Sequence, residues 1–189
     1  MSVHNDQTSD IGVGTFWRLM GMRPVAAAVV TASHDELPAG LLALSVTHVA
    51  ASPPTMLVCV GRSTSALTTI KAAGHFAISY LPAGANEIAE VFGGRRNLSG
   101  AERFTVGQWA PMAQWASAAP VLTDAVLALD CHVSAVFEYG DTEIIAARIE
   151  HFALDQNAMP LLAYRGSYHA MALANCFELN GAKNGEQAS

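Results

Sequence analysis

Residues 127–154 read LALDCHVSAVFEYGDTEIIAARIEHFAL, and this stretch decides the fold class. From residue 127 to residue 138 apolar or small side chains take every second position, while Asp130, His132 and Glu138 occupy positions between them. A two-residue period held this long predicts a half-buried β-strand. Residues 139–142, YGDT, are typical of a tight turn, so we expect the chain to run back as a second long strand.

The rest of the chain offers shorter strands and a few helices. Alternating apolar runs between turn residues predict strands, and apolar residues three or four apart predict helices that stop at glycine or proline. The expected strands are 25–31, 41–51, 55–60, 75–81 and 161–171, and the expected helices are 15–22, 85–92 and one from residues 63–65 to Gly74. Residues 107–120 carry two tryptophans and predict a long loop or a broken helix.

Strands that follow one another without β-α-β alternation indicate a mainly β protein. We expect an antiparallel β-barrel with short peripheral helices rather than a doubly wound sheet. The 189 residues suit one domain. We place it at 13–178, and we expect the polar or small-residue ends, 1–12 and 179–189, to be flexible.

The composition suggests that part of the surface is covered by a second subunit. Hydrophobic residues make up 51% of the chain, whereas charged residues make up only 14%. A typical globular protein has about 25% charged residues. With so little charge to cover its outside, the chain is expected to form a dimer.

Several classes of protein are excluded by charge and by the length of the apolar runs. The net charge is −6 and the basic residues are scattered, so we expect no nucleic-acid binding. The apolar runs are much shorter than the ~20 residues of a membrane-spanning helix, so we expect no membrane insertion. The polar N-terminus is unlike a signal peptide, and three cysteines without CxxC spacing fit a reducing, cytoplasmic location.

Familiar catalytic motifs are absent from the sequence. It contains no GxGxxG, GxxxxGK[ST], GxSxG or HExxH pattern. The seven histidines do not fall at metal-ligand spacing, so we expect no metal site. No acid–base pair or nucleophile stands out, and we therefore propose no catalytic side chain.

The segment 61–65, GRSTS, is a candidate anion site. It lies where a predicted strand passes into a predicted helix. Backbone N–H groups at a helix N-terminus, together with hydroxyls and a guanidinium, can bind a phosphate. The alternative is that Ser63 or Ser65 only caps the helix, and spacing alone favours the cap because caps are far commoner.

The order of these segments resembles the flavin reductase-like family. The resemblance rests first on PVAAAVVT at 24–31, LPAGLLALSVTHVAASPP at 37–54 and VCVGRSTS at 58–65. Residues 76–81, 89–93, 103–104, 129–133, 140–141 and 160–166 then follow in the family's order, so the match runs from about Phe16 to Tyr168. It implies an FMN-binding split β-barrel that works as a homodimer.

The resemblance also implies a set of cofactor-binding residues. Ser45, Val46 and Thr47 would border the isoalloxazine ring, although the hydroxyls of Ser45 and Thr47 also fit ordinary strand polarity. A core role for Phe92 is as plausible as a cofactor contact. The full implied set is Thr31, Leu44, Ser45, Val46 and Thr47 near the ring, Ser52, Pro53 and Pro54 in the adjoining loop, Cys59 and Val60 in the wall, Arg62, Ser63, Thr64 and Ser65 at the phosphate, and Phe92.

Two departures from the family pattern bear on the two nucleotides: the first removes a side-chain amide that could bond the flavin edge, and the second concerns the nicotinamide. Leu44 stands where the family commonly has asparagine, and Thr142 follows Gly140-Asp141 where many nicotinamide-using members have histidine. A threonine hydroxyl has neither the ring nor the positive charge of that imidazole. We therefore name Thr142 and His169 as candidates on the nicotinamide side, while noting that a lone strand histidine is more often structural.

The implied activity is hydride transfer from NAD(P)H to FMN or FAD. Reduced nicotinamide would stack on the flavin and need no side-chain base. The resemblance extends to reductase components of two-component flavin-dependent monooxygenases, so a partner oxygenase is expected. The alternative that Thr142 favours is an FMN-binding electron carrier or redox sensor without efficient nicotinamide turnover. A split barrel that binds haem, or no ligand, also stays open.

Overall fold

The computed structural model describes residues 11–171 and consists mainly of antiparallel strands. The strands are β1 (Val25–Ala26), β2 (Ala28–His34), β3 (Leu37–Ala43), β4 (Thr47–Ala51), β5 (Pro54–Gly61), β6 (His75–Tyr80), β7 (Trp109–Ala110), β8 (Val121–Leu122), β9 (Leu127–Tyr139), β10 (Thr142–Leu154), β11 (Leu161–Tyr164) and β12 (Ser167–Ala170). The helices are α1 (Val13–Met20), α2 (Ser65–Ala73), α3 (Asn86–Phe92) and the 3-10 helix η1 (Gly100–Thr105).

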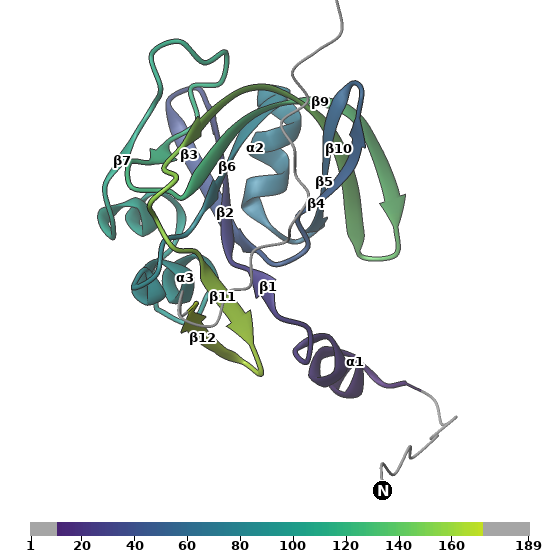
Figure 1. Cartoon of the computed structure of the whole chain (residues 1–189). Coiled ribbons are helices and arrows are strands. Elements are labelled where there is room, and N and C mark those ends of the chain that lie inside the picture. The colour runs from purple at the N-terminus through teal and green to yellow at the C-terminus, as the bar shows by residue number, and fades with distance from the viewer. Residues whose placement is uncertain (1–10, 172–189) are drawn as a thin grey trace, which may run out of the picture.

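One seven-stranded sheet dominates the molecule. Its strand order is β3-β2-β6-β9-β10-β5-β4, and it curls around α2 (Figure 1). A three-stranded sheet, β1-β11-β12, and a two-stranded sheet, β7-β8, complete the structure. The expected antiparallel, mainly β architecture is confirmed.

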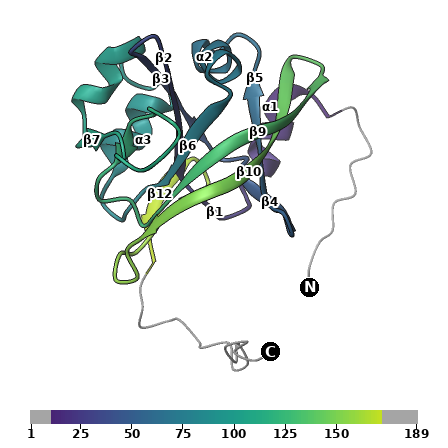
Figure 2. The same ribbon diagram turned by 90° about the horizontal axis from the view of Figure 1, so that it is seen from above.

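The long hairpin expected over residues 127–154 is present as β9 and β10. Seen from above, the two strands run as a ribbon across the whole molecule (Figure 2). Tyr139 pairs with Thr142, and Gly140 between them has φ 59°, a conformation that costs glycine little. Irregularities in register occur at Ala146/Ala147 and at Ile149/His151, and such bulges bend and twist a strand.

The main core lies inside the curled sheet, and α2 fills it. Leu67 and Ile70 of α2 pack with buried side chains from β2, β5, β6, β9 and β10, including Val58 and Phe76. This packing removes a large apolar area of the helix and of the strands from water, which stabilises the fold. The packing fixes the start of α2 next to the end of β5.

The predicted strand 41–51 is wrong as a single element. The chain forms β3 and β4 with an irregular break at residues 44–46. Within this break the Ser45 hydroxyl accepts the Cys59 N–H at 3.1 Å and donates to the Cys59 carbonyl oxygen at 3.2 Å. A side chain thus replaces the ladder hydrogen bonds, which an apolar run in the sequence does not reveal.

Other predicted boundaries also change. Strand 161–171 is instead the hairpin β11–β12, because Arg165 and Gly166 turn the chain with φ 52° and φ 75°. Strand 25–31 divides at Ala27 into β1, which pairs with β11, and β2, which pairs with β3 and β6. Helix 15–22 is α1, two residues earlier at each end, and the loop 107–120 contains the short strand β7.

Helix α1 stands away from the sheets and buries none of its residues in this chain (Figure 1). Of the ends expected to be flexible, all but Ile11 and Gly12 lie outside the described residues. Within residues 11–171 no helix is long and apolar enough to cross a membrane. In the same part of the chain, no group of three or more His, Cys, Asp or Glu side chains is placed to hold a metal ion.

Candidate functional site

The end of β5, the start of α2 and the β9–β10 turn meet at one place. Gly61, the last residue of β5, lies opposite Thr142 at the start of β10. The next residue, Arg62, donates its backbone N–H to the Asp141 carbonyl oxygen at 2.8 Å. The segment expected to hold a phosphate therefore lies against the turn that carries Thr142.

The hydroxyls at the start of α2 do not cap the helix. Thr64 is the N-cap residue, in an extended conformation, but its side chain forms no capping hydrogen bond. Within the described part of the chain, the hydroxyls of Ser63, Thr64 and Ser65 have no hydrogen-bond partner. The first turn of a helix also leaves backbone N–H groups unpaired, and its partial positive charge favours an anion. The capping hydrogen bond is absent at this helix start, so these hydroxyls remain available to an anion.

Arg62 lies between two carboxylates. Its Nη2 is 2.8 Å from Oε2 of Glu138, and its Nε is 3.8 Å from Oε1 of Glu143. Lys71 of α2 places Nζ 3.0 Å and 2.9 Å from the two carboxylate oxygens of Glu143. The sequence analysis missed Glu143 and Lys71. The sequence signal for Glu143 was its spacing from Ile145. The two residues are two positions apart on β10, so their side chains share the buried face of the strand.

Of the two β5 residues predicted to line the wall of the flavin site, Cys59 and Val60, only Cys59 lies on the outer face of the sheet. Its side chains alternate, so Val58 and Val60 are fully buried in the core while Leu57 and Cys59 are partly exposed. Cys59 therefore lies on the outer face of the sheet, and the Val60 side chain lies on the inner face. Burial raises the pKa of the Cys59 thiol, and a hydrogen bond with Ser45 opposes that shift.

The outer face around β4 and β5 is open and apolar. Every residue of β4 is exposed, as are the loop residues Ser52 and Pro53 that lead into β5. Leu44, Val49 and Phe137 have 41%, 55% and 58% of their surface exposed, although large apolar side chains are usually buried. An exposed apolar face of this kind marks a ligand or protein contact.

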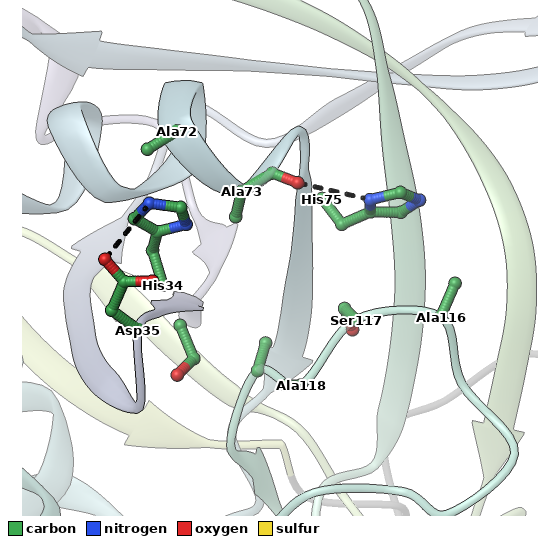
Figure 3. A pocket seen from close by; sticks show the side chains of 10 residues that line it. His34, Asp35, Ala72, Ala73, His75, Ala116, Ser117 and Ala118 are labelled. Atoms are coloured by element: carbon green, nitrogen blue, oxygen red, sulfur yellow. Dashed lines mark hydrogen bonds and ion pairs between the residues drawn. The ribbon is translucent and has the colours of Figure 1, made fainter.

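The cavities of the single chain lie elsewhere. One of about 370 Å³ opens at the other end of α2, where it is lined by Ala73, His75, Ser117, His34 at the end of β2 and Asp35 in the turn after it (Figure 3). Another of about 290 Å³ lies among residues 82–88 and 106–107. None of the predicted flavin residues lines either cavity. Most of those residues instead lie on an open surface of the chain, apart from the buried Thr31, Val60 and Phe92.

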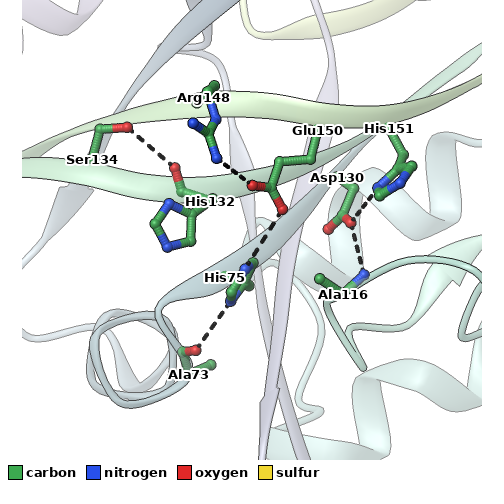
Figure 4. A network of polar contacts seen from close by, with 9 residues as sticks. All are labelled: Ala73, His75, Ala116, Asp130, His132, Ser134, Arg148, Glu150 and His151. Carbon is green, nitrogen blue, oxygen red and sulfur yellow. Dashed lines mark hydrogen bonds and ion pairs between the residues drawn. The ribbon is translucent and has the colours of Figure 1, made fainter.

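A polar network farther along β9 and β10 has a structural explanation (Figure 4). Oδ2 of the buried Asp130 accepts the Ala116 N–H at 3.1 Å and lies 3.2 Å from Nδ1 of His151. These contacts hold the 115–119 segment against the sheet. Nearby, a hydrogen bond from Arg148 lowers the pKa of Glu150.

Besides Val60, three predicted residues do not join the others. Thr31 is fully buried on β2 and donates its hydroxyl to the Pro120 carbonyl oxygen at 2.6 Å. Phe92 packs in the second core cluster, 5.2 Å from Phe104 and 5.1 Å from Trp109 between ring centroids. The core alternative left open for Phe92 is the one observed. His169 lies on β12 beside Tyr164, in the three-stranded sheet β1-β11-β12.

The remaining predicted residues fit a flavin nucleotide. Unpartnered hydroxyls, a helix N-terminus and Arg62 suit a terminal phosphate. The partly exposed outer face of β5, with the backbone of residues 44–47 beside it, suits a flat ring. The Ser45 hydroxyl already pairs with Cys59, so this residue offers a ring its backbone rather than its side chain.

Comparisons with known proteins agree with this geometry. The family model of the flavin reductase like domain matches residues 20–172. The FMN reductase (NADH) RutF of Ancylobacter novellus is 34% identical over 147 residues, which are 78% of this chain and 78% of that protein. The protein of the same name from Enterobacter sp. strain 638 is 29% identical over 168 residues, 89% of this chain and 99% of that one.

Solved structures are similar over most of their length. The NADH:FAD oxidoreductase of Streptomyces globisporus, in complex with NAD and FAD fragments, has a TM-score of 0.81 and 26% identity, covering 90% of this chain and 99% of that one. The styrene monooxygenase flavin reductase of Pseudomonas putida has a TM-score of 0.72 and 21% identity, covering 84% and 97%. The second likeness concerns the fold alone, and together they confirm the split β-barrel.

Proposed function

The chain belongs to the flavin reductase-like domain family, and from this membership we propose that it is an NADH-dependent reductase of FMN or FAD. The observation that carries the proposal is the start of α2, where three consecutive hydroxyls follow Arg62 at a helix N-terminus and the N-cap side chain forms no capping bond. A phosphate is the group that such a site recognises best. The NADH-dependent relatives support the same activity.

The residues of the chain would bind and orient the two nucleotides. Ser63, Thr64 and Ser65 would donate to the flavin phosphate, and Arg62 would add a positive charge. Cys59 and the backbone of residues 44–47 would lie against the ring. When bound, the flavin supplies a ring that accepts the hydride of reduced nicotinamide. Because the transfer needs no side-chain proton donor, positioning is the contribution of the protein.

We propose that the working form is a homodimer. The outer face that carries Leu44, Val49 and Phe137 is exposed in one chain, and α1 has Trp17 66% exposed. Burying such a face against a second copy is favourable, and it would turn an open surface into an enclosed site. The low charged fraction of 14% supports the same assembly.

We also propose a flavin-dependent monooxygenase as the partner that uses the reduced flavin, and the cytoplasm as the location. The likeness to a styrene monooxygenase reductase concerns the fold and leaves the substrate of such a partner open. Within residues 11–171 both cysteines, Cys59 and Cys131, are free thiols, which suits a reducing compartment.

An electron carrier or redox sensor is the second candidate, and Thr142 favours it. The Thr142 hydroxyl already donates to Oδ1 of Asp141 at 3.2 Å, so this position offers the nicotinamide neither a ring nor a free hydroxyl. NADH oxidation with FMN or FAD separates the candidates. A reductase accelerates NADH consumption in proportion to its concentration, whereas a carrier binds flavin and leaves NADH consumption at the rate without protein.

A further inference from the structure

Two acidic residues next to the proposed phosphate site are direct cross-strand partners. Glu138 on β9 pairs with Glu143 on β10, one residue before Thr142 meets Tyr139 in the turn. Like charges directly opposite each other destabilise a sheet. The Arg62 guanidinium contacts both carboxylates, at 2.8 Å and 3.8 Å, and so offsets their repulsion.

The two carboxylates differ in burial and in their other partners. The Glu143 side chain is 4% exposed, and both of its oxygens contact Nζ of Lys71. The Glu138 side chain is 63% exposed, and Arg62 is its one ion-pair partner in the described chain. A buried carboxylate between two cations is a fixed part of the structure, whereas an exposed ion pair is weak and exchanges readily.

The charges around Arg62 cancel. Arg62 and Lys71 carry two positive charges, and Glu138 and Glu143 carry two negative charges. An incoming phosphate therefore competes with the two carboxylates for the positive charge of Arg62. Glu138 is the one that can leave, because its contact is exposed and its side chain can move into water.

We infer that Glu143, held by Lys71 from the last turn of α2, is a positioning residue for Arg62, and that Glu138 is a competing counter-ion that the flavin phosphate displaces from Arg62. The inference rests on the proposed flavin site. It assigns opposite effects to two carboxylates that face each other across one pair of strands.

The test compares FMN with riboflavin, which has the same ring and no phosphate. Dissociation constants are measured by quenching of flavin fluorescence for the full chain and for its Glu138→Gln, Glu143→Gln and Glu143→Asp variants. Glu138→Gln is expected to bind FMN about 2- to 5-fold more tightly, as expected for removing an exposed ion pair. Glu143→Gln is expected to bind FMN about tenfold more weakly, and Glu143→Asp is expected to restore part of that loss because it keeps the charge.

Riboflavin affinity is expected to stay constant in the variants, since it reports the ring site. Glu87→Gln is the matched control, because Glu87 is an exposed carboxylate on α3 with no ion pair in the described chain. Equal changes for FMN and riboflavin would show a general structural effect and overturn the inference. If Glu143→Gln does not fold, the FMN affinities of Glu138→Gln and Glu143→Asp still test the two assigned roles.

The outcome also separates this inference from the proposed function. If the unmodified chain binds FMN and oxidises NADH while Glu138→Gln leaves the FMN affinity unchanged or weaker, the counter-ion role is wrong and the reductase stands. If the unmodified chain binds neither flavin, both are wrong.

Discussion

Replacing the Thr64 hydroxyl distinguishes a helix cap from a phosphate ligand. Thr64 is the N-cap residue of α2, yet its side chain makes no capping bond. If it were a cap, Thr64→Ala would cost about 1 kcal/mol of unfolding free energy, or about 2–4 °C in Tm for a domain of this size. Without the bond, we expect the loss to stay below about 0.5 kcal/mol, which is typical of a surface substitution.

The same substitution has a larger expected effect on FMN binding. A hydrogen bond to a charged group contributes about 1.5–3 kcal/mol. Thr64 is partly exposed, so we take the lower end, which corresponds to about a tenfold weaker FMN dissociation constant. Riboflavin binding is expected to change less than twofold, on the order of 0.4 kcal/mol, since it lacks the phosphate.

The assay combines thermal unfolding with fluorescence titration of both flavins. Thr68→Ala is the control, because Thr68 is an exposed hydroxyl of the same helix, beyond its first turn. We expect Thr68→Ala to leave both flavin affinities unchanged. A fall in Tm of 2–4 °C, as estimated above for a cap, with unchanged FMN affinity would refute the phosphate role and restore the cap.

Three further predictions follow from the open face, the turn and the core. Phe137→Ser removes an apolar side chain that is 58% exposed. It is expected to weaken dimerisation about tenfold or more, with little change in Tm. Unaltered sedimentation at equal concentration would contradict the proposed interface. Thr142→His adds an imidazole opposite Gly61. It is expected to raise kcat/KM for NADH on the order of tenfold, the effect of one hydrogen bond, while the FMN dissociation constant stays the same. An unchanged kcat/KM would show that residue 142 does not contact the nicotinamide. Burial, then the charge of Asp130, raises the pKa of Cys131 to about 12, so its stabilising contribution is complete below the unfolded thiol's pKa of about 8.5 and is lost as pH rises toward 12. Cys131→Ala is therefore expected to flatten the alkaline fall in unfolding free energy by up to about 1.4 kcal/mol per pH unit, and an unchanged pH profile in chemical denaturation would contradict this.

The sequence was most informative where one periodicity extends over many residues. The alternation from Leu127 to Glu138 predicts β9, in which Leu127, Leu129, Cys131 and Val133 pack in the main core, whereas Phe137 is exposed. The break at 44–46 was missed because the Ser45 hydroxyl supplies the missing ladder bonds, and a serine in a strand gives no sign of that role. Likewise, the turn at Arg165-Gly166 lies inside an otherwise strand-like run.

Site residues were predictable where they are neighbours along the chain and not where the fold brings them together. The 61–65 segment is continuous, so its hydroxyls and Arg62 could be proposed together as a candidate anion site from the sequence, although spacing alone favoured a helix cap. Adjacent strand residues face opposite sides, which is why Cys59 and Val60 cannot both contact one ring. The contact between Glu143 and Lys71 joins β10 to α2 across 72 positions, and only the register of the sheet against the helix brings it about.

Anaerobic mixing of the protein with one equivalent of FMN and excess NADH tests the central claim most directly. Absorbance is followed at the oxidised-flavin band and compared with free FMN and NADH under the same conditions. The account predicts rapid bleaching, far faster than for free FMN, and a rate that saturates with NADH. Tight FMN binding with no faster bleaching by NADH or NADPH would contradict the reductase and favour an electron carrier.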